Sequence, residues 1–108
     1  MKTLPPLKRG DTFQLGCLTK DSDGQPEDLS GVTLRAQARA ASSGALVAEL
    51  LVSKSDQVTH PGEFAISAGD TSAWPITMLL IDIERRIGPA VVSSETLQLA
   101  VLEDVTHD

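Results

Sequence analysis

The stretch that decides the fold begins with Lys8-Arg9-Gly10-Asp11-Thr12-Phe13 and ends with Asp21-Ser22-Asp23-Gly24-Gln25-Pro26-Glu27-Asp28-Leu29-Ser30-Gly31. Gly10 precedes a segment in which residues alternate between two faces, as they do in a β-strand. Asp23-Gly24 then supplies the positive φ angles that a tight hairpin turn needs. Gly31 precedes a second alternating segment. This order of parts predicts a small antiparallel β domain.

The composition is that of one globular domain. The chain has 108 residues, of which 41% are hydrophobic, so it can form one two-layer core. Only 3% of the residues are aromatic and none is Tyr, which argues against an aromatic platform for carbohydrate or single-stranded nucleic acid. The formal net charge of −6 disfavours nucleic acid as a partner, because the phosphate backbone is also negative.

The cysteine count and the N-terminal residues bear on where the protein works. Cys17 is the only cysteine, so no intramolecular disulfide can form, and its place in an alternating segment predicts a small core residue. Met1-Lys2-Thr3 leads into Leu4-Pro5-Pro6 without the apolar run of a signal peptide. The longest apolar run, residues 78–81, is too short to cross a bilayer. We therefore expect a cytoplasmic origin and no membrane partner.

Hydrophobic alternation with a period of two predicts six strands, at residues 12–20, 32–39, 46–53, 63–67, 77–87 and 93–103. The inward-facing residues expected from this pattern are Phe13, Leu15 and Cys17; Val32, Leu34, Ala36 and Ala38; Leu46, Ala48, Leu50 and Val52; Phe64 and Ile66; Leu79, Ile81 and Ile83; and Leu97, Leu99 and Val101. A helix over residues 34–51 is the competing interpretation, since Ala and Leu favour helices. Ser42-Ser43-Gly44 interrupts that segment, so the strands are preferred.

The predicted fold is all-β: an immunoglobulin-like antiparallel β-sandwich of about six to eight strands. Asp70-Thr71-Ser72-Ala73-Trp74 reads as one short helical turn with Asp70 as its cap, and Trp74 as a lid on one end of the sandwich. Residues 1–9 are expected to form an extended arm, residues 10–103 the sandwich, and residues 104–108 an acidic frayed tail.

No arrangement of residues predicts catalysis. The two histidines, His60 and His107, are far apart and lie near a turn and the C-terminal residue, and no Gly-x-Ser-x-Gly elbow is present. Two histidines and one cysteine cannot complete a zinc shell. Arg9-Gly10-Asp11 matches the cell-adhesion tripeptide, but flanking strand sequence favours a backbone bend at Gly10 that Asp11 caps. The sequence therefore predicts neither an enzyme nor a cofactor.

Three weaker signals stay open. Asp21, Asp23 and Asp28 could form a surface calcium site, although the glycine spacing departs from the helix-loop-helix calcium motif and a simple turn is preferred. Arg35, Arg39, Arg85 and Arg86 form the positive clusters, for which cross-strand ion pairs with Glu49, Asp82 and Glu84 are the default explanation and a partner-binding patch the alternative. An exposed Trp74 could instead anchor an interface.

Laid out in this order, the chain resembles small structural proteins of tailed bacteriophages and prophages, notably the N-terminal domain of baseplate upper proteins. The matching segments are residues 8–13, residues 23–31, an Arg-bearing strand ending at Arg39, Pro61-Gly62-Glu63-Phe64, residues 70–75, a strand containing Ile81-Asp82-Ile83, and residues 101–106. The resemblance implies an immunoglobulin-like sandwich that assembles with copies of itself or with other virion proteins, and it carries over no catalytic residue. Further parts follow this domain in baseplate upper proteins, whereas the sequence here ends at Asp108.

The expected function is thus that of a non-enzymatic structural or assembly protein of a phage tail, baseplate or head-tail joint, made in the bacterial cytoplasm and then part of the virion. The alternative is a small ligand- or carbohydrate-binding module, with or without calcium. Apolar residues on the arm and on nominally exposed strand faces are the expected contact residues for partner proteins: Leu4, Pro5, Leu7, Leu51, Met78 and Leu80.

Overall fold

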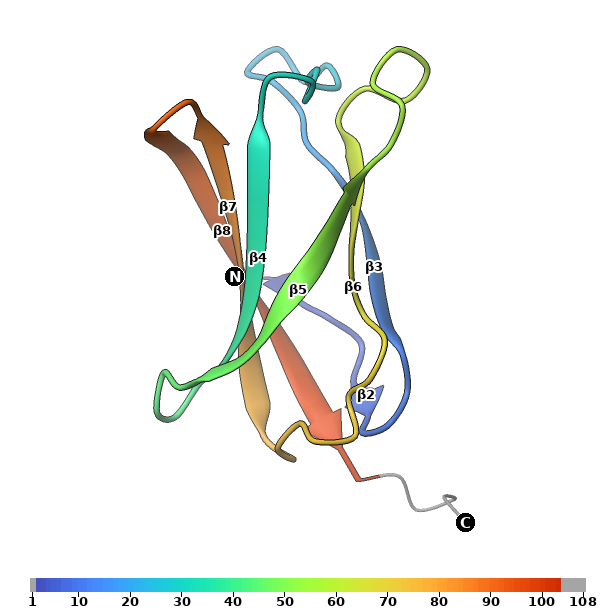
Figure 1. The fold of residues 1–108 in the computed structure, drawn as a ribbon, viewed down its shortest axis with the longest axis vertical. Helices are drawn as coiled ribbons and strands as arrows, with labels where there is room; N and C mark the ends of the chain where they lie inside the picture. The colour runs from blue at the N-terminus through green and yellow to red at the C-terminus, as the bar shows by residue number, and fades with distance from the viewer. Residues whose placement is uncertain (1, 104–108) are drawn as a thin grey trace.

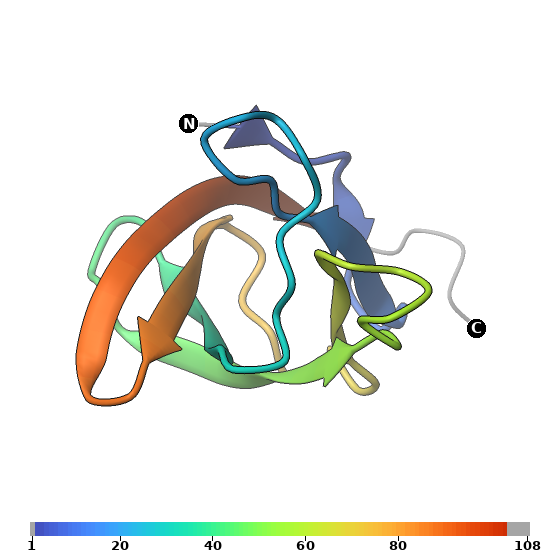
Figure 2. The ribbon, with the colours of Figure 1, turned by 90° about the horizontal axis from the view of Figure 1, so that it is seen from above.

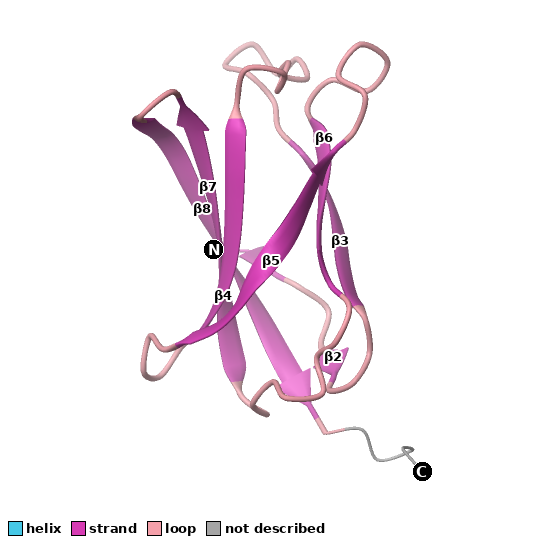
Figure 3. Ribbon diagram, viewed as in Figure 1, coloured by secondary structure: helices cyan, strands magenta, loops and turns pink. Residues whose placement is uncertain are grey.

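The computed structural model describes residues 2–103, and for residues 92–94 it describes the backbone alone. These residues form eight strands and no helix (Figure 3). The strands are β1 (Lys2–Thr3), β2 (Leu7–Lys8), β3 (Phe13–Leu18), β4 (Thr33–Ala40), β5 (Leu46–Lys54), β6 (Glu63–Ala68), β7 (Met78–Ile87) and β8 (Ala90–Leu102). The predicted all-β fold is confirmed, and the competing helix over residues 34–51 is wrong. The expected tail, residues 104–108 with His107, lies outside the described residues.

The strands form one curled sheet in the order β1-β8-β7-β4-β5-β6-β3, with β2 also paired to β8 (Figures 1 and 2). Strand β5 carries the curl, because Leu46–Leu50 pair with β4 whereas Leu51–Lys54 pair with β6. It therefore passes from the layer of β4, β7 and β8 to the layer of β3 and β6, which gives a sandwich-like fold. The sheet is mixed rather than purely antiparallel, since β1 and β2 both run parallel to β8.

The core lies between these two layers. Ile66, Leu79 and Ile81 have no exposed surface, and Leu99 is 1% exposed. The predicted inward sets on β4, β6, β7 and β8 are confirmed. Leu46 is an exception, because it is 51% exposed. A β-bulge between Ala38 and Arg39 shifts the register and places Leu46 opposite Arg39, whose side chain points outward.

The segment between β6 and β7, which carries Trp74, crosses the end of the sandwich that is lowest in Figure 1, and Trp74 is buried there as predicted for a lid. Its indole is 4% exposed, and its ring centroid lies 6.0 Å from that of Phe13. The expected helical turn is instead a hydrogen-bonded turn, in which the Trp74 amide donates to the Thr71 carbonyl over 3.0 Å. Asp70 caps it by accepting from the Ser72 amide over 2.9 Å. Pro75 follows directly and has no amide hydrogen to continue a helical ladder.

The N-terminal arm is folded onto the body rather than free. Its two short strands pair with β8, and between them Leu4 enters the core with 6% of its surface exposed. This corrects the expectation that Leu4 belongs to an exposed contact surface. The apolar Leu4 side chain is stabilised by burial, and the edge of β8 supplies hydrogen-bond partners for the arm.

The bend between the arm and β3 depends on Thr71, which the sequence pattern did not indicate. Gly10 has a φ of +99°, so the predicted glycine bend is confirmed. The fully buried Thr71 hydroxyl donates to the Asp11 carbonyl over 2.6 Å and accepts from the Gly10 amide over 2.9 Å. The bend is thus held by Thr71 and main-chain groups, and the expectation that the Asp11 side chain caps it is wrong, because among residues 2–103 the Asp11 carboxylate accepts no hydrogen bond there.

Candidate functional site

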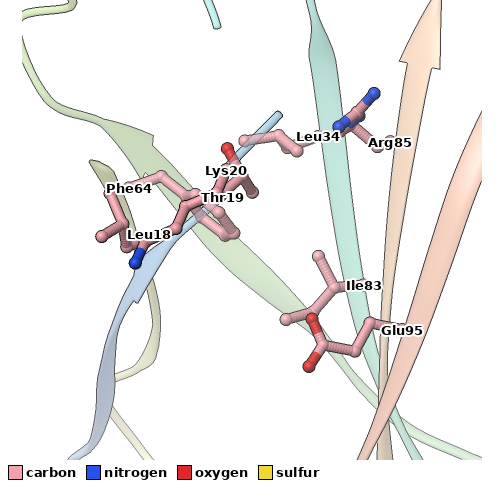
Figure 4. Close-up of a pocket in the computed structure, with 8 residues that line it drawn as sticks. All are labelled: Leu18, Thr19, Lys20, Leu34, Phe64, Ile83, Arg85 and Glu95. Carbon is pink, nitrogen blue, oxygen red and sulfur yellow. The ribbon is translucent and has the colours of Figure 1, made fainter. Parts of the chain in front are cut away.

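The curled sheet is not closed between its two ends, and the opening there, which we call the wedge, holds a cavity. The outer edge of β3 has no partner strand among the described residues, and on β8 the arm covers only residues 97–98 and 101–102. The cavity has a volume of about 310 Å³. Figure 4 shows its lining: Leu18, Thr19, Lys20, Leu34, Phe64, Ile83, Arg85 and Glu95.

The lining combines an apolar floor with a few charges. Phe64, Ile83 and Leu34 come from three different strands, and Lys20 and Glu95 place opposite charges on the lining. Such a cavity suits an apolar group about the size of an amino-acid side chain. It offers no nucleophile-base pair within hydrogen-bond reach.

Arg85 lines this cavity and holds the loop between β3 and β4 against the sheet through an ion pair. It lies on the same face of β7 as the core residue Ile83, and its guanidinium is paired with Glu27 from the loop between β3 and β4. Its Nε atom is buried without a hydrogen-bond acceptor among the described groups. The ion pair ties the loop to the sheet, and Arg85 is therefore engaged within the fold rather than presented to a partner.

Cys17 lines the adjoining part of the wedge, together with Lys2 and Leu97. Burial raises the pKa of its thiol, and the carboxylate of Glu95 raises it further. Cys17 was predicted to be a small core residue; it packs against the core but is only half-buried.

The remaining arginines of the positive clusters lie on the outer face of the sheet. Arg35 forms a cross-strand ion pair with Glu49 at 2.9 Å, and Gln37 donates to the same carboxylate over 2.7 Å. These two hydrogen bonds hold the pKa of Glu49 below its usual value. Arg39 donates to Gln37 and to the Gly44 carbonyl.

The predicted cross-strand pairing is thus confirmed for Arg35 with Glu49. It is wrong for Asp82, which accepts from Thr96 over 2.7 Å, and for Arg86, which pairs with Glu84 on its own strand. The two register partners Asp82 and Thr96 face each other on adjacent strands, so the carboxylate finds its hydrogen bond there.

A second feature of the outer face is apolar, and we call it the lower outer patch: Leu46, Met78, Leu80, Ala100 and Leu102. Cross-strand register places Met78 opposite Ala100, with Leu80 and Leu102 two residues along on the same faces of β7 and β8, whereas Leu46 lies on the far side of Arg39 from Leu80. Leu46 is 51% exposed, Leu102 46% and Met78 37%. Met78, Leu80, Ala100 and Leu102 are thus neighbours on a face that also carries charged residues, and Leu46 flanks them beyond Arg39.

The predicted contact residues thus fall in different places. Met78 and Leu80 lie in the lower outer patch, and the structure adds Leu46 and Leu102 to them. Leu51 is 69% exposed but stands apart, opposite Ser67. On the arm, Pro5 is exposed, whereas Leu7 is half-buried and packed against the core. Leu46 could not be found from alternation alone, because the bulge decides its exposure, whereas alternation with the inward Leu99 and Val101 already places Leu102 on the outer face.

The acidic turn is built as a turn. Asp21 accepts from the amides of Asp23 and Gln25 through one oxygen, over 2.9 Å and 3.0 Å. Asp28 accepts from the Ser30 amide, and this hydrogen bond lowers the pKa of its carboxyl. Among the residues that the structure describes, no group of three or more acidic, histidine or cysteine side chains is placed to hold a metal ion. The hydrogen bonds of Asp21 confirm that this segment forms a turn.

Comparison with protein-family models and with curated proteins finds no match for this chain. Within residues 2–103 there is also no helix with the length and apolar character that a membrane crossing requires.

Proposed function

We propose that this protein is a structural assembly component that acts through protein-protein contacts rather than through catalysis. The observation that carries the proposal is the lower outer patch, where Met78 and Leu102 expose large apolar side chains on the neighbouring strands β7 and β8 and Leu46 adds another beyond Arg39. Contiguous apolar surface of this kind favours burial against another protein. The patch lies on strands, so it presents a rigid surface that needs little ordering on binding.

The resemblance to tail-associated proteins of bacteriophages supports placing this component in a phage or prophage particle. The segments that carry the resemblance are turns and strand starts, among them residues 23–31 and Pro61-Gly62-Glu63-Phe64. The sandwich-like fold is compatible with such a role. On this proposal the partners are other copies of the chain or neighbouring tail, baseplate or head-tail proteins, and the protein passes from the bacterial cytoplasm into the virion.

The test is the native mass of the purified protein by light scattering over a concentration series. We expect Met78→Lys to weaken association, because a lysine ammonium in the patch would have to be desolvated at the interface. Leu51→Lys is the matched control, since Leu51 is also a large exposed apolar residue, 69% exposed against 37% for Met78, but stands apart from the patch. Equal effects of the two substitutions would contradict a role for the patch.

A protein that is monomeric alone is tested with its partners. Particles from an induced prophage should then contain the chain, as detected by mass spectrometry. Met78→Lys should reduce the amount of the chain in these particles relative to Leu51→Lys. Absence from particles, together with a monomeric state, would refute the proposal.

The wedge cavity supports a second candidate function, the binding of a small apolar ligand. Its floor of Leu34, Phe64 and Ile83 would bury such a ligand, and its volume of about 310 Å³ lies at the lower end of ligand pockets. An environment-sensitive apolar dye should then bind with one-to-one stoichiometry, and Leu18→Arg at the cavity wall should abolish binding. Dye binding that Leu18→Arg leaves unchanged would place the dye elsewhere on the surface.

A further inference from the structure

The N-terminal arm, residues 2–8, is attached to the rest of the molecule by a separable set of contacts. Its two strands pair only with β8 among the described strands, in two parallel ladders of two residues each. The Leu4 amide donates to the Gln98 carbonyl and the Arg9 amide to the Leu102 carbonyl, each over 2.8 Å. Leu4 is the one arm residue that is buried in the core.

These contacts join segments from opposite ends of the chain, and among the described strands the arm pairs with none that lies near it in sequence. The arm does not pair with β3, the strand that follows it in sequence. Thr3 and Gln98 are 95 positions apart, yet their side chains meet at 3.1 Å. A β8 edge on any copy of the chain therefore offers the arm the same hydrogen bonds and the same core position for Leu4.

The hinge between arm and body is short and bent back on itself. The Asp11 amide donates to the Lys8 carbonyl over 3.0 Å, and Gly10 takes a φ of +99° within this turn. Short hinges that must close in this way favour exchange between copies, because an opened hinge can be extended while every other contact is restored.

We propose, on the basis of the assembly function proposed above, that the arm exchanges between copies: residues 2–8 of one copy pair with β8 of a second copy, whose core receives Leu4. The occupant of the β8 edge is thus a second copy of this chain. Pro5 and Pro6 support the exchange, because they keep a released arm extended and so reduce the conformational entropy lost when it docks again.

Two single-cysteine proteins test the exchange, both carrying Cys17→Ser. One carries Thr3→Cys and the other Gln98→Cys, at positions that are direct partners in the β1-β8 register and within disulfide reach. The proteins are mixed in equal amounts, unfolded, refolded together and oxidised, and the cross-linked peptides are identified by mass spectrometry. Exchange predicts a disulfide that joins residue 3 of one chain to residue 98 of the other.

A matched control uses Gln37→Cys mixed with Glu49→Cys in the same background. These two positions are also direct partners, on β4 and β5, but neither belongs to the arm. The exchange predicts cross-linking between chains for the 3-98 mixture well above this control. The double variant Thr3→Cys/Gln98→Cys shows whether the two positions can form a bond at all.

The proposal is overturned if the 3-98 mixture gives no more interchain bond than the control while the double variant closes within one chain. It is also overturned if neither forms, because closed and exchanged arms both place residue 3 beside residue 98. Either result would remove self-exchange and leave the assembly function to be decided by the patch variants and by incorporation into particles.

Discussion

Gly62→Ala is the substitution for which the structure predicts the largest effect from a single added methyl group. Gly62 is buried at the start of β6 with a φ of +80°, and a Cβ there would lie 2.4 Å from the Thr19 carbonyl oxygen and 3.1 Å from the Glu27 amide. Both neighbours are backbone atoms, so neither can rotate away as a side chain could. The loop between β3 and β4 would have to move away from β6.

The magnitude follows from two contributions. A residue with a Cβ in the left-handed region costs roughly 1–2 kcal/mol. Moving Thr19 away also disturbs two hydrogen bonds. The Thr19 amide donates to the Gly62 carbonyl over 2.9 Å, and the Glu27 amide donates to the Thr19 carbonyl over 3.0 Å. Each hydrogen bond contributes about 1 kcal/mol net, so we expect a total loss of about 3–4 kcal/mol in the free energy of unfolding.

The assay is urea unfolding followed by the fluorescence of Trp74, the only tryptophan in the chain. With an m-value of about 1.5 kcal/mol/M, the midpoint should fall by about 2 M. Gly24→Ala is the matched control, because Gly24 has a φ of +81° but a Cβ added there would meet nothing within 4 Å. It should lose only the backbone term of roughly 1–2 kcal/mol. Equal losses for the two variants would refute the reasoning from the Thr19 contact.

Three further outcomes are expected. Leu4→Ala should lower the free energy of unfolding by about 2–3 kcal/mol in urea unfolding, because Leu4 is buried, and a loss under about 0.5 kcal/mol would show that the arm is not docked in solution. The free energy of unfolding should fall as the pH drops below about 4, because the folded state holds the pKa values of Asp28, Glu49 and Asp70 below their unfolded values. The stabilisation from these carboxylates is present above the unfolded pKa and is lost as the pH falls through the folded pKa. Glu49→Gln should therefore flatten a plot of unfolding free energy against pH. Cys17 should react with a thiol reagent at pH 8 more slowly than a cysteine in an unfolded peptide, because burial raises its pKa, and an equal rate would contradict the half-buried position.

The strands and their inward faces could be predicted from the sequence, because the local geometry of the backbone is sufficient to determine them. Alternation places successive side chains on opposite faces of a strand, so Leu79, Ile81 and Ile83 could be assigned to the core before any partner strand was known. The bend at Gly10 could likewise be predicted, because it occurs where a left-handed conformation favours glycine.

Pairing between distant segments is what the sequence left open and only the tertiary structure decided. Alternation does not specify which edge a strand joins, so it could not show that the arm adds to β8 in parallel and buries Leu4. Nor could it show the bulge at Ala38 and Arg39, which turns Leu46 outward beside Arg39. The wedge has the same origin, since it forms where β3 and the β1-β8 pair, far apart in the chain, come to opposite ends of one curled sheet that does not close. The residues thus determined the strands and their inner faces through local physics, whereas the candidate surfaces arise from long-range register.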